Sequence, residues 1–168
     1  ITWFTSTAMA AHLPALLQQL GLTLAAALSL AALVGPAQVG ARLLEFGLLR
    51  KMHPLLSARL ATAAHPLGAA LLIALGTPLA LLFTLLHGAG NGILTIAKGT
   101  LPLVVFGAHG YGARQGLLMA PARLAQAAAP LLFGMLVQRW GSDALWFSAG
   151  LGLLAFVCLL GIRIHDGR

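Results

Sequence analysis

Two apolar segments of the sequence carry a histidine next to residues that perturb helices. The first contains His12-Leu-Pro14, and the second contains His87-Gly-Ala-Gly-Asn91-Gly92. Imidazole and amide groups inside an apolar segment can contact a solute, and imidazole can also exchange protons. The alternative is that each group hydrogen-bonds a neighbouring helix. We predict that His12, His87 and Asn91 are substrate-binding residues.

A different chemistry is indicated by Arg123, which lies in the middle of another apolar segment. It shares one helical face with Gln115, Met119 and Gln126, because these residues are three or four positions apart. A charge at the centre of a bilayer costs at least about 3 kcal/mol on insertion scales, so it must face a cavity or a partner. We predict that Arg123 and Gln126 bind an anionic group of a solute. The alternative is a structural arginine bonded to backbone carbonyls.

Other sites are not expected from the residue types present. Cys158 is the only cysteine, and no Asp or Glu lies deep in an apolar segment, so neither a metal site nor a cofactor is predicted. The glycines of segment 87–99 have GxGxG spacing, whereas a nucleotide loop has GxGxxG after a strand. We therefore expect a membrane helix whose glycines let neighbouring helices approach closely.

The elements that position these residues are predicted to be membrane helices. The chain has 168 residues, of which 60% are hydrophobic and 8% are charged, whereas about a quarter are charged in soluble domains. Its net charge of +7 does not indicate nucleic-acid binding, because no basic and aromatic residues interleave. The sequence predicts one all-α domain, 1–168, in the lipid bilayer. Its six transmembrane helices are expected at about 1–19, 23–43, 57–75, 79–97, 114–137 and 144–162.

The basic residues are predicted to gather on one side of the membrane. If the chain crosses six times, the connections at 44–56 and 98–113 fall on the same side as the C-terminus. Such an excess of basic residues marks the cytoplasmic side, which predicts a multi-pass protein of a bacterial inner membrane with a cytoplasmic C-terminus. The residues are Arg42, Arg50, Lys51, Arg59, Lys98, Arg114, Arg163 and Arg168.

Two stretches resemble a family of transporters. GPAQVGARLLEFGLLRKMHP (35–54) is similar to the cytoplasmic loop that follows the second helix of each half of a major facilitator superfamily (MFS) transporter. KGTLPLVVFGAHGYGARQGLLMAP (98–121) resembles the fourth connection and fifth helix of bacterial members. The chain as a whole therefore looks like the C-terminal six-helix half of such a transporter. The loop residues that carry the resemblance are Gly40, Glu45, Gly47, Arg50 and Lys51.

The resemblance implies two inverted three-helix repeats and a central cavity lined by the first and fourth helices of the half. It implies secondary transport of a small organic solute by alternating access, and it places the other six helices upstream of Ile1. The proton is the candidate coupling ion, carried by a histidine here or by a carboxylate in the missing half.

A gate is predicted at the cytoplasmic mouth of this cavity. Gln38, Arg42 and Glu45 share one face of a helix, and we expect an Arg42–Glu45 ion pair to bias the gate. Arg50 and Lys51 complete the predicted gating loop.

Two other functions remain open on the sequence alone. One is a free-standing six-helix scaffold or assembly protein that dimerises. The other is an intramembrane hydrolase, which needs a nucleophile and a base that face each other. Because no serine has a Gly-x-Ser-Gly setting, an enzyme is not expected. We interpret His65-Pro66 as a kink and the row Ala144, Ser148 and Gly152 as a helix-packing surface.

Overall fold

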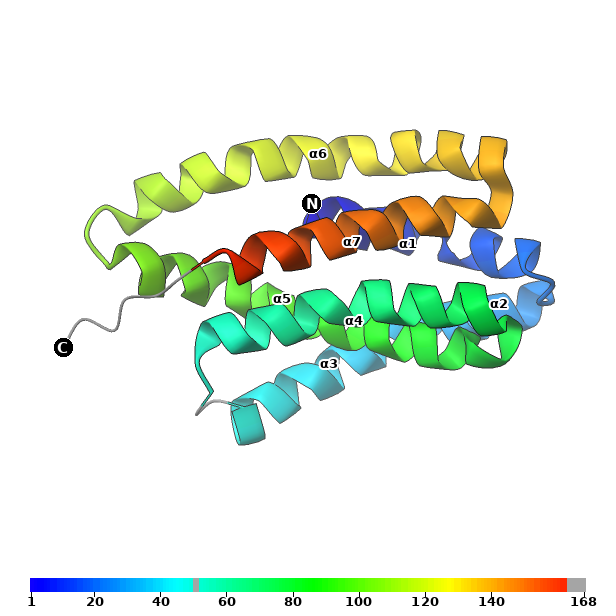
Figure 1. Cartoon of the computed structure of the whole chain (residues 1–168), viewed down its shortest axis with the longest axis horizontal. Helices are drawn as coiled ribbons and strands as arrows, with labels where there is room; N and C mark the ends of the chain where they lie inside the picture. The colour runs from blue at the N-terminus through cyan, green and yellow to red at the C-terminus, as the bar shows by residue number, and fades with distance from the viewer. Residues whose placement is uncertain (50–51, 163–168) are drawn as a thin grey trace.

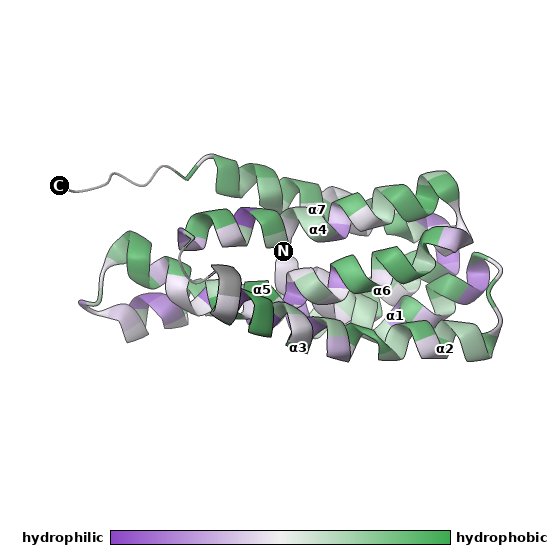
Figure 2. Cartoon of the chain, turned by 90° about the horizontal axis from the view of Figure 1, so that it is seen from below, coloured by the Kyte–Doolittle hydropathy of each residue, from purple (hydrophilic) through white to green (hydrophobic). Residues whose placement is uncertain are grey.

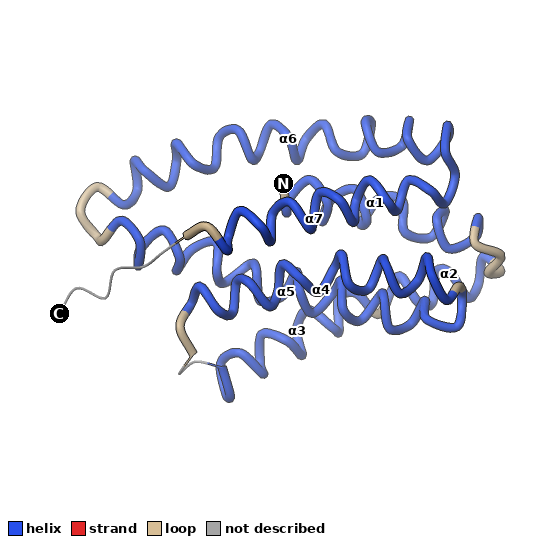
Figure 3. Tube along the Cα trace, viewed as in Figure 1, coloured by secondary structure: helices blue, strands red, loops and turns tan. Residues whose placement is uncertain are grey.

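The computed structural model describes residues 1–49 and 52–162, which are helical apart from short turns (Figure 1). The helices run along the long axis of the molecule, and Figure 3 shows that short loops join them. A π-helical turn, Glu45–Leu49, continues α3, and 3-10 turns, Thr77–Leu79 and Gly141–Asp143, precede α5 and α7. The helices are α1 (Thr2–Gln19), α2 (Leu24–Ala32), α3 (Val34–Leu44), α4 (Pro54–Leu75), α5 (Ala80–Phe106), α6 (Tyr111–Trp140) and α7 (Ala144–Leu160).

Four segments of the described chain are long and apolar enough to cross a membrane. The last of them contains both α6 and α7, since the turn at Gly141–Asp143 reverses the chain between these two helices (Figure 1). Hydrophobic residues predominate along the helices, as Figure 2 shows. The protein is therefore all-helical and suited to a membrane, as predicted. The four segments are Leu24–Gly47, Pro54–Leu75, Thr77–Phe106 and Tyr111–Leu160.

Helix α5 holds a central position in the packing. It packs against α3 and α4, while α4 also packs against α7, and α1 packs against α6 and α2. The apolar core lies toward the turns at 20–23, 76–79 and 141–143 and includes Leu17, Leu72, Phe83 and Phe133. This well-packed end of the bundle therefore fixes the positions of the helices that carry the polar side chains.

The long connection predicted at 98–113 is wrong. Helix α5 continues to Phe106 and α6 begins at Tyr111, so only a short turn separates them. The prediction ended the helix at Lys98 because of its charge, but this ammonium lies 4.9 Å from the ring centroid of Trp3 and the apolar residues beyond it extend the helix. The chain turns at Gly107 and Gly110, whose φ angles of 75° and 63° suit glycine.

The two ends of the bundle differ in charge. The start of α4, the turn at 107–110 and the C-terminal end of α7 lie at one end, and the turns at 20–23, 76–79 and 141–143 lie at the other (Figure 1). The half of the bundle nearer to the first end contains four of the eight predicted basic residues, Arg42, Arg59, Lys98 and Arg114. The other four, Arg50, Lys51, Arg163 and Arg168, lie outside the described residues.

Candidate functional site

The glycines of the segment 87–99 set the distance between α5 and its neighbours. A Cβ atom on Gly90 would lie 2.6 Å from the carbonyl oxygen of Ala61 in α4. A Cβ atom on Gly92 would overlap the carbonyl oxygen of Gln38 in α3, and Gly88 faces α3 in a similar way. Helix α5 is thus in backbone contact on two sides. The prediction that this segment is a helix with glycine-mediated packing is confirmed.

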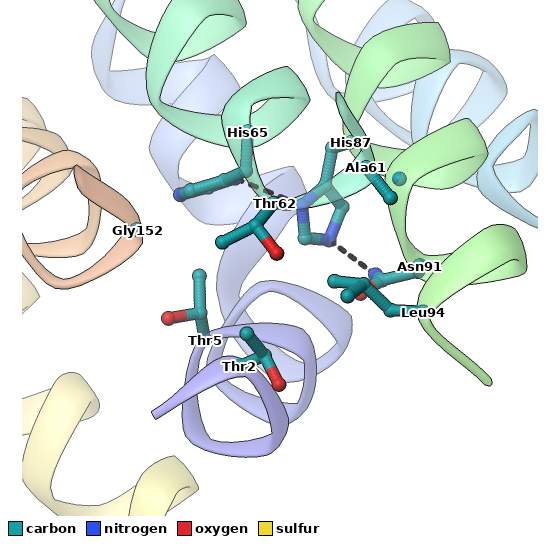
Figure 4. A pocket seen from close by; sticks show the side chains of 10 residues that line it. Thr2, Thr5, Ala61, Thr62, His65, His87, Asn91, Leu94 and Gly152 are labelled. Atoms are coloured by element: carbon teal, nitrogen blue, oxygen red, sulfur yellow. Dashed lines mark hydrogen bonds between the residues drawn. The ribbon is translucent and has the colours of Figure 1, made fainter. Parts of the chain in front are cut away.

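Two histidines meet at the place where α4 and α5 approach each other. The Nδ1 atoms of His65 and His87 lie 2.9 Å apart, and His87 Nε2 lies 3.0 Å from Nδ2 of Asn91 (Figure 4). On the far side, His65 Nε2 lies 3.2 Å from the hydroxyl oxygen of Ser148 in α7. We call His65, His87, Asn91 and Ser148 the polar series. It joins α4, α5 and α7; the side chains of His65, His87 and Ser148 are buried, and that of Asn91 is half-buried.

The hydrogen bonds of the polar series share one direction. An amide nitrogen only donates, so Asn91 donates to His87 Nε2 and the proton of this imidazole is on Nδ1. His87 then donates to His65 Nδ1, and His65 donates from Nε2 to Ser148. The Ser148 hydroxyl donates to the carbonyl oxygen of Leu145 at 2.9 Å. Both imidazoles are neutral in this arrangement, and each ring nitrogen has a partner.

His65 was not predicted as a site residue, because its helix was expected to be peripheral and the adjacent proline suggested a kink. The packing prediction for the row that contains Ser148 and Gly152 is supported, since a Cβ atom on Gly152 would lie 2.9 Å from Pro66 and 3.3 Å from His65. The same row brings a hydroxyl to His65. One signal was available in the sequence, because His65 is an ionisable residue within a predicted span, like the two histidines that were chosen.

A recess opens between α1, α3 and α5 beside the polar series. Its volume is about 210 Å³, and the polar part of its lining comes from Ser6, Gln38, His87 and Asn91. We call it the α1–α3–α5 recess. Two of the predicted substrate-binding residues, His87 and Asn91, thus meet there with Gln38, which was predicted for the gate.

The Arg42–Glu45 ion pair is not formed within the described residues. Arg42 donates from Nη2 to Gln38 Oε1 and to Thr95 Oγ1, each at 3.4 Å. Glu45 begins the π-helical turn, and its Oε2 atom is buried without a hydrogen-bond partner among the described residues. The spacing of three residues gave a shared face, but α5 lies close enough to attract the guanidinium group. Arg50 and Lys51, the remaining predicted gating residues, lie outside the described residues.

His12 does not line the α1–α3–α5 recess. Its Nε2 atom lies 2.8 Å from the carbonyl oxygen of Pro130, and its ring lies 5.9 Å from that of Phe133. A Cβ atom on Gly134 would lie 3.0 Å from the imidazole, so α1 and α6 are close at this point. The alternative considered for His12, a hydrogen bond to a neighbouring helix, describes its position.

Arg123 and Gln126 lie on α6, outside the lining of the recess. The guanidinium carbon of Arg123 is 3.8 Å from the ring centroid of Trp3, and its Nη1 atom donates to Gln126 Oε1 at 3.0 Å. Lys98 contacts the same ring from α5. The two cations share an aromatic ring, and the binding of a solute anion by Arg123 and Gln126 stays a prediction.

Comparisons with protein-family models, with curated protein sequences and with solved structures gave no match. The resemblance to MFS transporters therefore stays a prediction from the sequence.

Proposed function

We propose that the chain is the C-terminal half of an MFS-type secondary transporter and that a small organic solute binds in the α1–α3–α5 recess. The observation that carries this proposal is the position of His87 and Asn91 in that recess. Helices α1 and α5 are the first and fourth segments, which the resemblance places at the central cavity. Polar groups inside a membrane bundle are costly, so their convergence on an open space favours a binding role.

The pattern of helix contacts supports two inverted repeats. In such a repeat, α1 corresponds to α5, the continuous α2–α3 segment corresponds to α6, and α4 corresponds to α7. The contact between α1 and α6 then corresponds to the contact between α5 and α3. The contact between α4 and α7 joins two corresponding helices. All three contacts are present, as a repeat of three segments requires. We accordingly propose six transmembrane segments, with α1 as the first.

The uneven distribution of charge supports an orientation for this half. The end of the bundle that carries Arg42, Arg59 and Arg114 suits the cytoplasmic side of a bacterial inner membrane. Arg59 also donates to the carbonyl oxygens of Leu159 and Ile162, at 3.1 and 3.0 Å, which fixes the start of α4 against the end of α7. The C-terminal end of α7 then lies on the cytoplasmic side.

A second function is suggested by the order of groups in the polar series. Hydrolases place a nucleophile, a base and an orienting group in a row. The same spatial order is found in Ser148, His65 and His87. Ser148, however, is only 1% exposed, and its hydroxyl donates to a backbone carbonyl. A nucleophile must reach its substrate, so this geometry favours transport. Labelling of Ser148 by a serine-directed covalent probe would support the hydrolase instead.

The transport proposal is tested with the complete transporter in proteoliposomes, using a panel of small organic acids, amines and sugars. At least one solute should cross, and the substitution Asn91→Ala should reduce its initial rate about tenfold, as expected for the loss of one polar contact of about 1.4 kcal/mol. Ser29→Ala is the matched control, because Ser29 is exposed on α2. Equal rates for the wild type and Asn91→Ala would exclude the recess as the solute site.

A further inference from the structure

The polar series contains two titratable side chains, His65 and His87. The proposed solute site gives no role to them as a pair. His65 and His87 are 7% and 2% exposed, and they contact each other through their Nδ1 atoms. We infer that this pair is a binding site for one proton, which enters from water at His87 Nε2. The site is formed by α4 and α5 and is completed by Asn91 and Ser148.

The hydrogen bonds determine where an added proton can go. In the neutral series, His65 Nδ1 already accepts the proton of His87, and His65 Nε2 already carries a proton toward Ser148. The remaining lone pair is on His87 Nε2, which faces Asn91. Hydronium can give its proton to this atom and leave as water. His87 then donates from both nitrogens, and its Nδ1 proton can be shared with His65 in a charge-assisted hydrogen bond.

Asn91 must respond to this proton. Its Nδ2 atom faces His87 Nε2 in the neutral state, and two donors cannot face each other. A half-turn of the Asn91 amide presents Oδ1 to the protonated ring. Protonation therefore reverses the amide of a residue that lines the α1–α3–α5 recess.

The surroundings of the pair offer a cation partners other than a carboxylate. The fully buried Phe83 ring lies 5.6 Å from His65 and 6.0 Å from His87, centroid to centroid, which is within the range of cation–π attraction. A small pocket beside both rings has about 20 Å³ open to the centre of a water molecule, enough for about one water. Figure 4 shows the hydroxyls of Thr5 and Thr62 around it. The other polar side chains that line this pocket and the recess do not titrate: Thr2, Thr5, Ser6, Gln38 and Thr62.

The consequence for transport rests on the proposed function, although the proton site itself does not. In the neutral state the free end of the Asn91 amide is Oδ1, which accepts hydrogen bonds from a solute. In the protonated state the free end is Nδ2, which donates them. One proton thus changes the hydrogen bonding that the recess offers to a solute, which couples proton binding to solute binding.

The test uses full-length protein with 15N-labelled histidine in lipid nanodiscs, followed by NMR across pH. A scalar coupling between the Nδ1 atoms of His65 and His87 should be present. As the pH falls, the two rings should respond in one step that adds one proton to the pair. The pair is overturned as a proton site if both rings stay neutral at every pH at which the protein remains folded, or if each ring takes up its own proton independently.

Two variants keep the inference testable if one of them fails to fold. His65→Gln should abolish the coupling between the rings and change the titration of His87, and an unchanged His87 titration would overturn the shared site. Asn91→Asp places a carboxylate beside His87 Nε2, so the pair should stay protonated to a higher pH than in the wild type, by about 1–3 units. An unchanged midpoint would also count against the site. His12→Gln is the matched control, because His12 bonds a backbone carbonyl of α6.

The two proposals fail in different ways. Solute flux that depends on Asn91, without any proton uptake by the rings, would leave the recess in place and remove the proton site. Proton uptake by the pair in a protein that moves no solute of the panel would leave the proton site in place and remove the transport function.

Discussion

Helices α5 and α6 both carry polar residues in apolar sequence, yet their surroundings are opposite. His87 of α5 bonds His65 of α4 inside the bundle, and Asn91 bonds His87 and lines the recess with residues of α1 and α3. Arg123 of α6 lies at the surface, where Leu117 and Leu124 are 79% and 74% exposed. A polar residue in a membrane segment can therefore find partners in the interior of the bundle or at its surface. The close contacts at the glycines of α5 place its polar side chains inside the bundle.

The largest effect on the difference between α5 and α6 is expected when α5 is separated from its neighbours. Gly92→Val should destabilise the fold by about 3 kcal/mol, because its side chain would meet the Gln38 backbone, which cannot move aside. Unfolding in detergent, followed by circular dichroism, measures the loss. Gly116→Val on α6 is the control, since a Cβ atom there meets nothing within 4 Å. Equal losses at the two glycines would contradict the contrast.

A smaller effect is expected when the end of the polar series is removed. Ser148→Ala leaves the buried N–H group of His65 without its acceptor, and we expect a loss of about 2 kcal/mol in unfolding free energy. Ser29→Ala, on an exposed position of α2, should change the same quantity by less than about 0.5 kcal/mol. If both variants unfold alike, the hydrogen bond between His65 and Ser148 does not support the fold.

His12 tests whether an intramembrane histidine outside the recess is structural. His12→Leu removes the hydrogen bond to the Pro130 carbonyl, so stability should fall by about 1 kcal/mol while solute flux is retained. Flux in proteoliposomes and unfolding in detergent are measured on the same variant. A loss of flux with unchanged stability would return His12 to the solute site.

The smallest effect is expected on α6. Arg123→Gln removes one cation from the Trp3 ring at an exposed position, which is worth about 0.5 kcal/mol. Solute flux should stay close to that of the wild type, because Arg123 does not line the recess. A large loss of flux would show that Arg123 supplies the countercharge for an anionic solute, as the sequence predicts.

The helices and the role of the glycines in α5 could be predicted because both depend on local sequence. Long apolar stretches and the close spacing of Gly88, Gly90 and Gly92 are sufficient for that. The end of α5 was predicted too early, because the sequence does not show that Lys98 contacts Trp3 of α1 and lies within the helix. The hydrogen-bond partners of single residues could not be predicted either, because they lie on distant helices. His65 bonds His87 on α5, and His12 bonds the carbonyl oxygen of Pro130 on α6.

The backbone contacts of α5 have a consequence for how the site can move. Because α3 and α4 touch this helix at successive glycines, α5 has no clearance to turn about its own axis. Changes at His87 and Asn91 must then come from rotation about side-chain bonds, with the helix carried as part of a rigid group. In this group the spacing of α3, α4 and α5 is fixed by backbone contacts, and the imidazole and amide side chains are the parts left to change.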